Sequence, residues 1–122
     1  MWIRQCILLV FVVFVFFHIF AISVAAKSGR AITDLEIAEK KSSCNADIVS
    51  GLWGRRCKSS MIEKENCALR CLSSQCYDYI YGGDPLEEGE RNHIRWQEFK
   101  YCMHRSSLGE SLDGVKGAFN DY

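Results

Sequence analysis

Four of the chain's seven cysteines fall within residues 57–76, CKSSMIEKENCALRCLSSQC. A helix-start signature stands within this stretch, because Ser60 can cap a helix and Glu63 follows three residues later as its capping-box partner. Cys67 and Cys71 are four residues apart, so their Cβ atoms lie on one side of the helix at about 5–6 Å. A disulfide requires a Cβ separation of about 3.5–4.5 Å. We therefore expect each of them to bond to a different segment and to cross-link this helix along one side.

The same stretch has the pattern of a core-facing helix. Met61, Ala68 and Leu72 fall on one stripe at helical spacing, and Leu69 lies beside it. Two serines then interrupt the helix, and the run YDYIY follows at residues 77–81. That run fits either a continued helix or a short extended piece, and its sequence leaves both open.

Cysteine usage points to disulfides. One cysteine, Cys6, lies inside an apolar amino-terminal segment, and six remain: Cys44, Cys57, Cys67, Cys71, Cys76 and Cys102. Behind a secretory signal, six cysteines are typical of three disulfides, for which 15 connectivities exist. At about 2–4 kcal/mol each, three bridges would match the net stability of a small domain. Cys102 must reach back either to the Cys67–Cys76 cluster, which we favour, or to the amino-terminal pair.

Other thiol chemistry has less support. The gaps between the six cysteines are 12, 9, 3, 4 and 25 residues, without the short CxxC pairs typical of zinc sites and redox centres. The nine-residue gap is that of helical hairpins oxidised in the mitochondrial intermembrane space, but a second such pair is absent. We therefore predict no metal site, and we keep a thiol-redox protein using Cys67 or Cys71 as an alternative.

The amino terminus carries a targeting or anchoring segment. Residues 6–22, CILLVFVVFVFFHIFAI, form an apolar run that Arg4 precedes and small residues follow. Val24 and Ala26 fit a cleavage site after Ala26, so we expect residues 1–26 to be a cleaved signal peptide. The run is also at the lower limit for a membrane-spanning helix, which needs about 17–25 residues. A retained signal anchor is therefore the alternative.

We divide the rest of the chain into a linker or short helix at 27–43, a cysteine-rich helical domain at 44–109 and a carboxy-terminal tail at 110–122. In the linker, Thr33 and Glu36 form a second capping-box signature. Residues 44–58 contain two glycines and show no sustained period of either kind. They therefore predict an irregular loop.

A further helix is predicted to start at Asp84. Asp84 can cap it, Pro85 suits its first position and Gly109 supplies its end. Its core-facing side chains recur at helical spacing: Trp96, Phe99 and Met103. Its charges match the helix dipole, with acidic residues first and basic residues last: Glu87, Glu88 and Glu90, then Lys100, His104 and Arg105.

Composition and motifs restrict the function classes. The 122 residues include 15 basic and 15 acidic side chains without a basic block, so we expect no nucleic-acid partner. The motifs GxSxG, HExxH, GxGxxG and the Walker loop are absent. His93 and His104 would lie about 16 Å apart along one helix, too far to share a small site. We therefore predict no catalytic residue and no cofactor, and we interpret Arg55-Arg56 as surface charge rather than a processing site.

Two blocks carry a resemblance to a known family: NCALRCLSSQCYDYIYGGDPLEEGE at residues 66–90 and RWQEFKYCMHRSSLGESLDG at residues 95–114. They resemble a family of small, uncharacterised plant proteins with an amino-terminal hydrophobic segment and a cysteine-rich region. The resemblance covers about Cys57 to Gly114. It implies a recurring architecture and assigns neither an activity nor a catalytic residue.

The sequence thus predicts a mainly α fold, a small disulfide-stapled domain of two to three helices and irregular loops after an amino-terminal hydrophobic segment. We expect an extracellular or luminal protein of the secretory pathway that acts without catalysis, through contacts with an unidentified protein partner. A membrane becomes a partner only if the amino-terminal segment is retained. The alternative is then a single-pass, membrane-anchored luminal protein.

Overall fold

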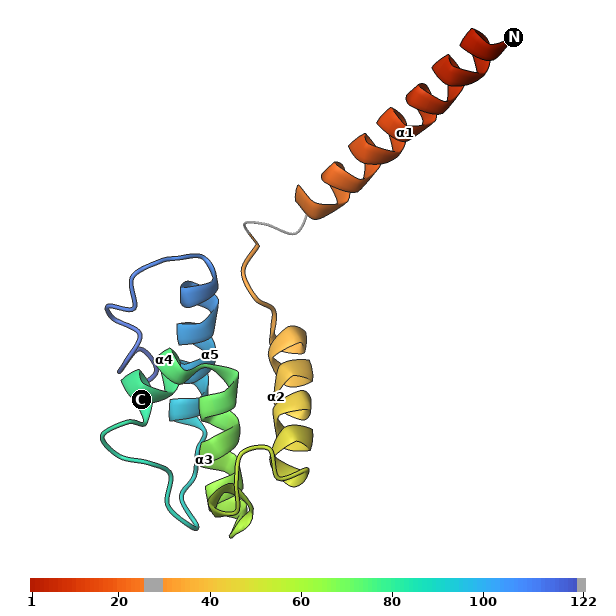
Figure 1. The fold of residues 1–122 in the computed structure, drawn as a ribbon. Coiled ribbons are helices and arrows are strands. Elements are labelled where there is room, and N and C mark those ends of the chain that lie inside the picture. The colour runs from red at the N-terminus through yellow and green to blue at the C-terminus, as the bar shows by residue number, and fades with distance from the viewer. Residues whose placement is uncertain (26–29, 121–122) are drawn as a thin grey trace. The chain divides into compact units, whose positions relative to one another are not determined.

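A computed structural model describes residues 1–25 and 30–120 of the chain (Figure 1). It separates into two compact units, Met1–Arg30 and Ala31–Tyr122. The helices are α1 (Trp2–Ala25), α2 (Asp34–Val49), α3 (Met61–Leu72), α4 (Ser74–Ile80) and α5 (Ile94–Ser107), with the short 3-10 helix η1 (Arg56–Lys58) between α2 and α3. The described ranges contain no strand. The predicted mainly α fold is confirmed, but the domain has four α-helices rather than two or three.

Helix α1 belongs to the first unit. Its 18 residues Trp2–Ile19 are long and apolar enough to cross a membrane, and none of them is buried. A signal sequence near an amino terminus has the same length and composition as a short anchor, so both interpretations of the segment stand. The cleavage position expected after Ala26 lies outside the described residues.

Helix α2 crosses the boundary that the sequence suggested between residues 43 and 44. It begins as expected, because the Thr33 Oγ1 atom accepts a hydrogen bond from the Glu36 N–H at 3.2 Å. Its buried side chains share one face: Ile37, Cys44 and Ile48. Burying that face requires the whole helix to pack, so residues 34–43 are part of the domain and residues 44–49 are helical rather than loop.

Helices α3 and α4 meet at Ser73. The Ser73 N–H donates to the Leu69 carbonyl and ends α3, while its Oγ accepts the Cys76 N–H at 3.1 Å and starts α4. Residues 77–80 of the run therefore lie in helix α4, and Tyr81 follows as its C-cap. Ser60 caps α3 as predicted, but Met61 is 89% exposed and does not belong to the core stripe.

The helix expected to start at Asp84 does not form there. Residues 81–93 make an irregular connection, and α5 begins only at Ile94. The backbone of the buried Leu86 is hydrogen-bonded to the Asn66 side chain of α3, and Gly89 has a φ of +82°. These long-range bonds compete successfully with the local capping signal. Accordingly, the acidic residues that follow Pro85 lie in a loop and not in a helical first turn.

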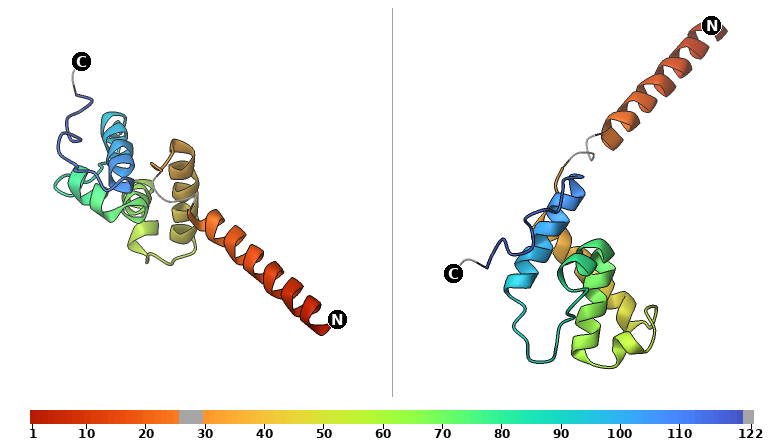
Figure 2. Two further views of the ribbon diagram at one scale, coloured as in Figure 1. Left: turned by 90° about the horizontal axis from the view of Figure 1, so that it is seen from above. Right: turned by 90° about the vertical axis from the view of Figure 1, so that its left-hand side faces the viewer.

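The core of the domain lies among α2, α3, α4 and α5 (Figure 2). Its fully buried side chains include Leu69, Tyr81, Phe99 and Val115. Val115 belongs to the tail, which packs on the helices through further bonds. Tyr79 Oη donates to the Leu112 carbonyl at 3.1 Å, and the Gly117 N–H donates to the buried Glu98 carboxylate at 3.2 Å. The described part of the tail is therefore part of the domain.

Candidate functional site

Three disulfides pair all six cysteines of the domain. They join Cys44 to Cys71, Cys57 to Cys67 and Cys76 to Cys102, with Cα–Cα distances of 5.9, 5.8 and 5.8 Å. Cys67 and Cys71 each bond to a different segment, and Cys102 bonds within the cluster of residues 67–76. Cys67 and Cys71 are therefore both disulfide-bonded in this structure rather than free thiols. Cys6 on α1 is the unpaired cysteine.

The two histidines of the domain lie at opposite ends of α5. His93 is exposed just before the helix. His104 Nε2 lies 3.0 Å from Asp34 Oδ1, and Lys100 Nζ lies 3.7 Å from the other oxygen. The hydrogen bond with His104 lowers the pKa of Asp34, and the charge of Lys100 acts in the same direction. His104 therefore connects α5 to the first turn of α2.

Within the described ranges, no group of three or more His, Cys, Asp and Glu side chains has the arrangement of a metal site. The acidic residues of the 81–93 connection are exposed on the surface. Glu90 accepts the Glu87 N–H at 3.0 Å and pairs with Arg95 at 2.5 Å, and these contacts lower the pKa of Glu90. Arg95 Nη1 also donates to the Asp84 carbonyl at 2.5 Å. These residues fix the shape of a loop.

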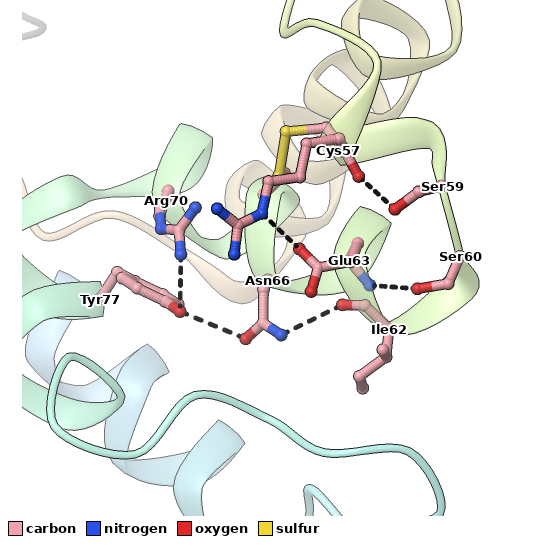
Figure 3. The surroundings of a disulfide bond; sticks show 10 residues. Cys57, Ser59, Ser60, Ile62, Glu63, Asn66, Arg70 and Tyr77 are labelled. Carbon is pink, nitrogen blue, oxygen red and sulfur yellow. Dashed lines mark hydrogen bonds and ion pairs between the residues drawn. A yellow bond between two sulfur atoms is a disulfide. The ribbon is translucent and has the colours of Figure 1, made fainter.

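Asn66 is the polar centre of the domain (Figure 3). Its Oδ1 accepts hydrogen bonds from the Leu86 N–H at 3.0 Å and from Tyr77 Oη at 3.3 Å. Its Nδ2 donates to the carbonyls of Leu86 and Ile62 at 3.0 and 3.2 Å. Arg70 donates to Tyr77 Oη at 3.3 Å and completes the chain of bonds. A buried amide with all its groups paired stabilises one arrangement of α3, α4 and the loop.

Tyr81 anchors the other end of that loop. It is fully buried, and its Oη donates to Asn92 Oδ1 at 2.7 Å. The Arg95 guanidinium lies 4.7 Å from the centre of the Tyr81 ring. Burial raises the pKa of Tyr81 to about 12. The phenol is therefore a neutral structural donor at physiological pH.

The exposed apolar side chains of the domain concentrate in one segment. Among the described residues of the domain, six large apolar side chains are exposed: Leu35, Val49, Leu52, Trp53, Met61 and Leu108. Four of them lie between the end of α2 and the first residue of α3, which we call the 49–61 segment. Leu52 is 76% exposed and Trp53 is 39% exposed. Because these exposed apolar side chains are close together in the sequence, this segment is the candidate contact surface of the domain.

A small core holds the 49–61 segment from beneath. It consists of Ile48, Cys57, Cys67 and Ala68, which are all buried. The segment turns at Gly51 and Gly54, with φ values of +92° and +87°, a region that favours glycine. The Cys57–Cys67 disulfide then fixes η1 against α3. Helices α2 and α3 therefore fix the two ends of the backbone that carries the exposed side chains, and the disulfide fixes its middle.

The sequence pattern did not single out this surface. The sequence predicts an irregular loop around Trp53, and it predicts a core position for Met61 because the spacing of Met61 matches the buried stripe of α3. Apolar identity alone predicts burial, so exposure at Leu52 and Met61 follows only from the packed structure. Asn66 likewise stands at a helical position with no polar motif around it. Its partner Leu86 is 20 residues away in the chain.

The fold and these contacts define a small, disulfide-linked helical domain that follows an apolar amino-terminal helix. The chain belongs to the family described as Domain of unknown function (DUF4787), whose model matches residues 34–102. That range begins at α2 and includes all six disulfide cysteines. No curated protein matches the chain, and no solved structure matches it. The expected uncharacterised family is thereby confirmed, while a plant origin stays a prediction.

Proposed function

We propose that this protein enters the secretory pathway and acts without catalysis, as a module that binds another protein through the 49–61 segment. Two observations support the route. Six paired cysteines are typical of proteins that fold in an oxidising compartment. An apolar amino-terminal helix is typical of a secretory signal. The mature protein then begins at Lys27 and is extracellular or luminal.

The exposed apolar side chains of the 49–61 segment carry the proposal. A small domain with a marginal core gains nothing from leaving Val49, Leu52, Trp53 and Met61 in water. Tryptophan and methionine are enriched where proteins bind each other, and tryptophan is frequent among residues that dominate binding energy. A backbone already fixed by the Cys57–Cys67 disulfide also loses little conformational entropy on binding.

A second candidate keeps α1 as a membrane anchor, with the same domain held at the luminal or outer face. The length and apolar composition of Trp2–Ile19 favour it. Extraction of membranes with alkaline carbonate separates the two candidates. A cleaved protein is released into the soluble fraction, whereas an anchored protein stays with the lipid.

The interaction is tested by photo-crosslinking from position 52 in cells that secrete the protein. A protein captured at this position is then purified, and its affinity for the unlabelled domain is measured by calorimetry. We expect the double variant Leu52→Ser, Trp53→Ser to weaken this affinity by at least about tenfold, since a buried anchor residue contributes about 2 kcal/mol or more.

The matched control is the double variant Leu35→Ser, Leu108→Ser, which removes the two leucines that are exposed outside the segment among the described residues of the domain. Its affinity for the captured protein should be within about twofold of that of the unmodified protein, because most surface positions contribute little to binding. The proposed contact surface would be contradicted if both double variants lost the same amount of affinity, or if neither lost any.

A further inference from the structure

Three basic residues lie within four consecutive positions of the 49–61 segment. Arg55, Arg56 and Lys58 occur in the order basic, basic, cysteine, basic. All three are exposed, and the side chain of Arg56 is 90% exposed. Cys57 between them is buried and bonded to Cys67, so the backbone that carries the cations is fixed. We call Arg55, Arg56 and Lys58 the basic triplet.

Few negative charges oppose the basic triplet. Residues 48–62 contain no aspartate or glutamate. Arg56 Nε lies 3.7 Å from a carboxylate oxygen of Glu63, while Arg55 and Lys58 have no ion-pair partner within the described residues. Two unpaired cations and one weakly paired cation on a rigid turn make a local positive site in a chain whose net charge is zero.

The beginning of α3 adds to this positive site. Met61 follows Lys58 by three residues, and α3 continues to Leu72. Ser60 Oγ accepts the Glu63 N–H, whereas the N–H groups of Met61 and Ile62 precede any intrahelical acceptor. The positive end of the helix dipole therefore lies beside the triplet and attracts the same kind of ligand.

We propose that the basic triplet binds a linear anionic polysaccharide, for which heparin serves as the probe. Segments rich in lysine and arginine are typical of surfaces that bind polyanions such as heparin. Such a polymer presents acidic groups repeatedly along one line, which suits three cations and a helix start in one short segment. It is also encountered along the secretory route and outside the cell, where the proposed function places the protein.

The surroundings of the triplet favour a linear polyanion over a flat anionic surface. The connection between α4 and α5 lies at the same end of the domain as the 49–61 segment (Figure 1, Figure 2). That connection carries exposed carboxylates at Glu87 and Glu88. An anionic membrane that approached this end would contact both the 49–61 segment and the α4–α5 connection, and the carboxylates of the connection would repel it. A single polysaccharide strand needs to contact only the triplet.

The experiment measures the affinity of heparin for the protein obtained by secretory expression of the full chain, over a series of salt concentrations. The triple variant Arg55→Ser, Arg56→Ser, Lys58→Ser should bind at least about tenfold more weakly near physiological salt. The slope of log Kd against log salt concentration should fall by about two to three, because each cation that contacts a dense polyanion releases about one counterion.

The matched control removes three exposed cations elsewhere: Lys40→Ser, Arg91→Ser and Lys116→Ser. It has the same net charge as the triple variant and should retain most of the affinity and the full slope. Equal weakening in both triple variants would show that heparin responds only to net charge and would overturn the proposal. So would equal or tighter binding to a DNA duplex, or to vesicles of equal parts phosphatidylcholine and phosphatidylserine.

Polysaccharide binding by the triplet rests on the proposed secretory route but not on the proposed protein contact, so either kind of binding can be disproved without the other. The Leu52→Ser, Trp53→Ser variant keeps the basic triplet and should bind heparin with an unchanged slope. Loss of heparin binding in that variant would mean that the apolar side chains, and not the cations, carry the interaction.

Discussion

Both the oxygen and the nitrogen of the Asn66 side-chain amide are hydrogen-bonded to the backbone of Leu86. Asn66 Oδ1 accepts the Leu86 N–H, and Asn66 Nδ2 donates to the Leu86 carbonyl, each at 3.0 Å. The two residues are 20 positions apart, and both are buried. This pair holds the 81–93 connection against α3. It explains why a segment with a strong helix-start signature remains irregular.

Replacing Asn66 with alanine should destabilise the domain by about 2–4 kcal/mol. The Leu86 N–H and carbonyl would be left buried without a partner, and each such group costs about 1–3 kcal/mol. Chemical denaturation monitored by circular dichroism measures the change. The control is Asn45→Ala, at a half-buried asparagine on α2 whose side chain makes no hydrogen bond within the described residues; it should change stability by less than about 0.5 kcal/mol. Similar values for the two variants would show that the pair contributes little.

Gly82 and Gly83 should respond differently to alanine, although they are neighbours. A Cβ atom at Gly82 would lie 2.4 Å from the Asp78 carbonyl oxygen, whereas a Cβ at Gly83 would meet nothing within 4 Å. Because the close atom belongs to the backbone of α4, Gly82→Ala should cost about 1–3 kcal/mol. Gly83→Ala should be neutral or slightly stabilising. Thermal unfolding of both variants makes the comparison, and a neutral Gly82→Ala would disprove the close approach.

Tyr81 should ionise in a separate step near pH 12. Burial raises its pKa from 10.0 to about 12, so the folded state keeps a proton that the unfolded state loses. The stability that this contributes is present below pH 10 and disappears as the pH rises through 12. The near-ultraviolet absorbance of tyrosinate follows the step, which the Tyr81→Phe variant should lack. If the Tyr81→Phe variant still showed the absorbance step near pH 12, the step would belong to another tyrosine.

The Asp34 contacts should make stability depend on acid. Hydrogen bonding to His104 lowers the pKa of Asp34 below 3.8, so its stabilising effect is present above that value. It is lost as the pH falls through the lower, folded-state pKa. The Tm difference between the unmodified protein and Asp34→Asn should therefore be clear at pH 6 and vanish at the acid end of the titration. Glu39→Gln, an exposed carboxylate on the same helix, should change Tm little at either pH. A difference for Asp34→Asn that persists unchanged in strong acid would contradict this assignment.

Local signals in the sequence were reliable where their partners are close in the chain. Ser60 and Thr33 cap α3 and α2, and each bonds to an N–H three residues away. The spacing of Phe99 and Met103 placed both on the buried face of α5. These features depend on backbone geometry within one or two turns, which a short stretch of sequence contains.

The remaining features depend on contacts between distant segments. The Asp84-Pro85 signature is strong, but the burial of Leu86 against Asn66 overrides it. Ser73 ends one helix and starts another through two different hydrogen bonds, which residue type alone does not distinguish from an interruption. The exposure of Leu52 and Met61 is a property of the packed domain. The candidate contact surface therefore became visible only in the structure.

The most direct test of the account is the intact mass of the protein recovered from secretory expression, alkylated with and without prior reduction. We predict a mass that begins at Lys27, no alkylated cysteine before reduction, and unreduced digests that link Cys44 to Cys71, Cys57 to Cys67 and Cys76 to Cys102. A full-length mass, a cysteine alkylated without reduction or a different set of linked peptides would contradict a secreted domain built on these three disulfides.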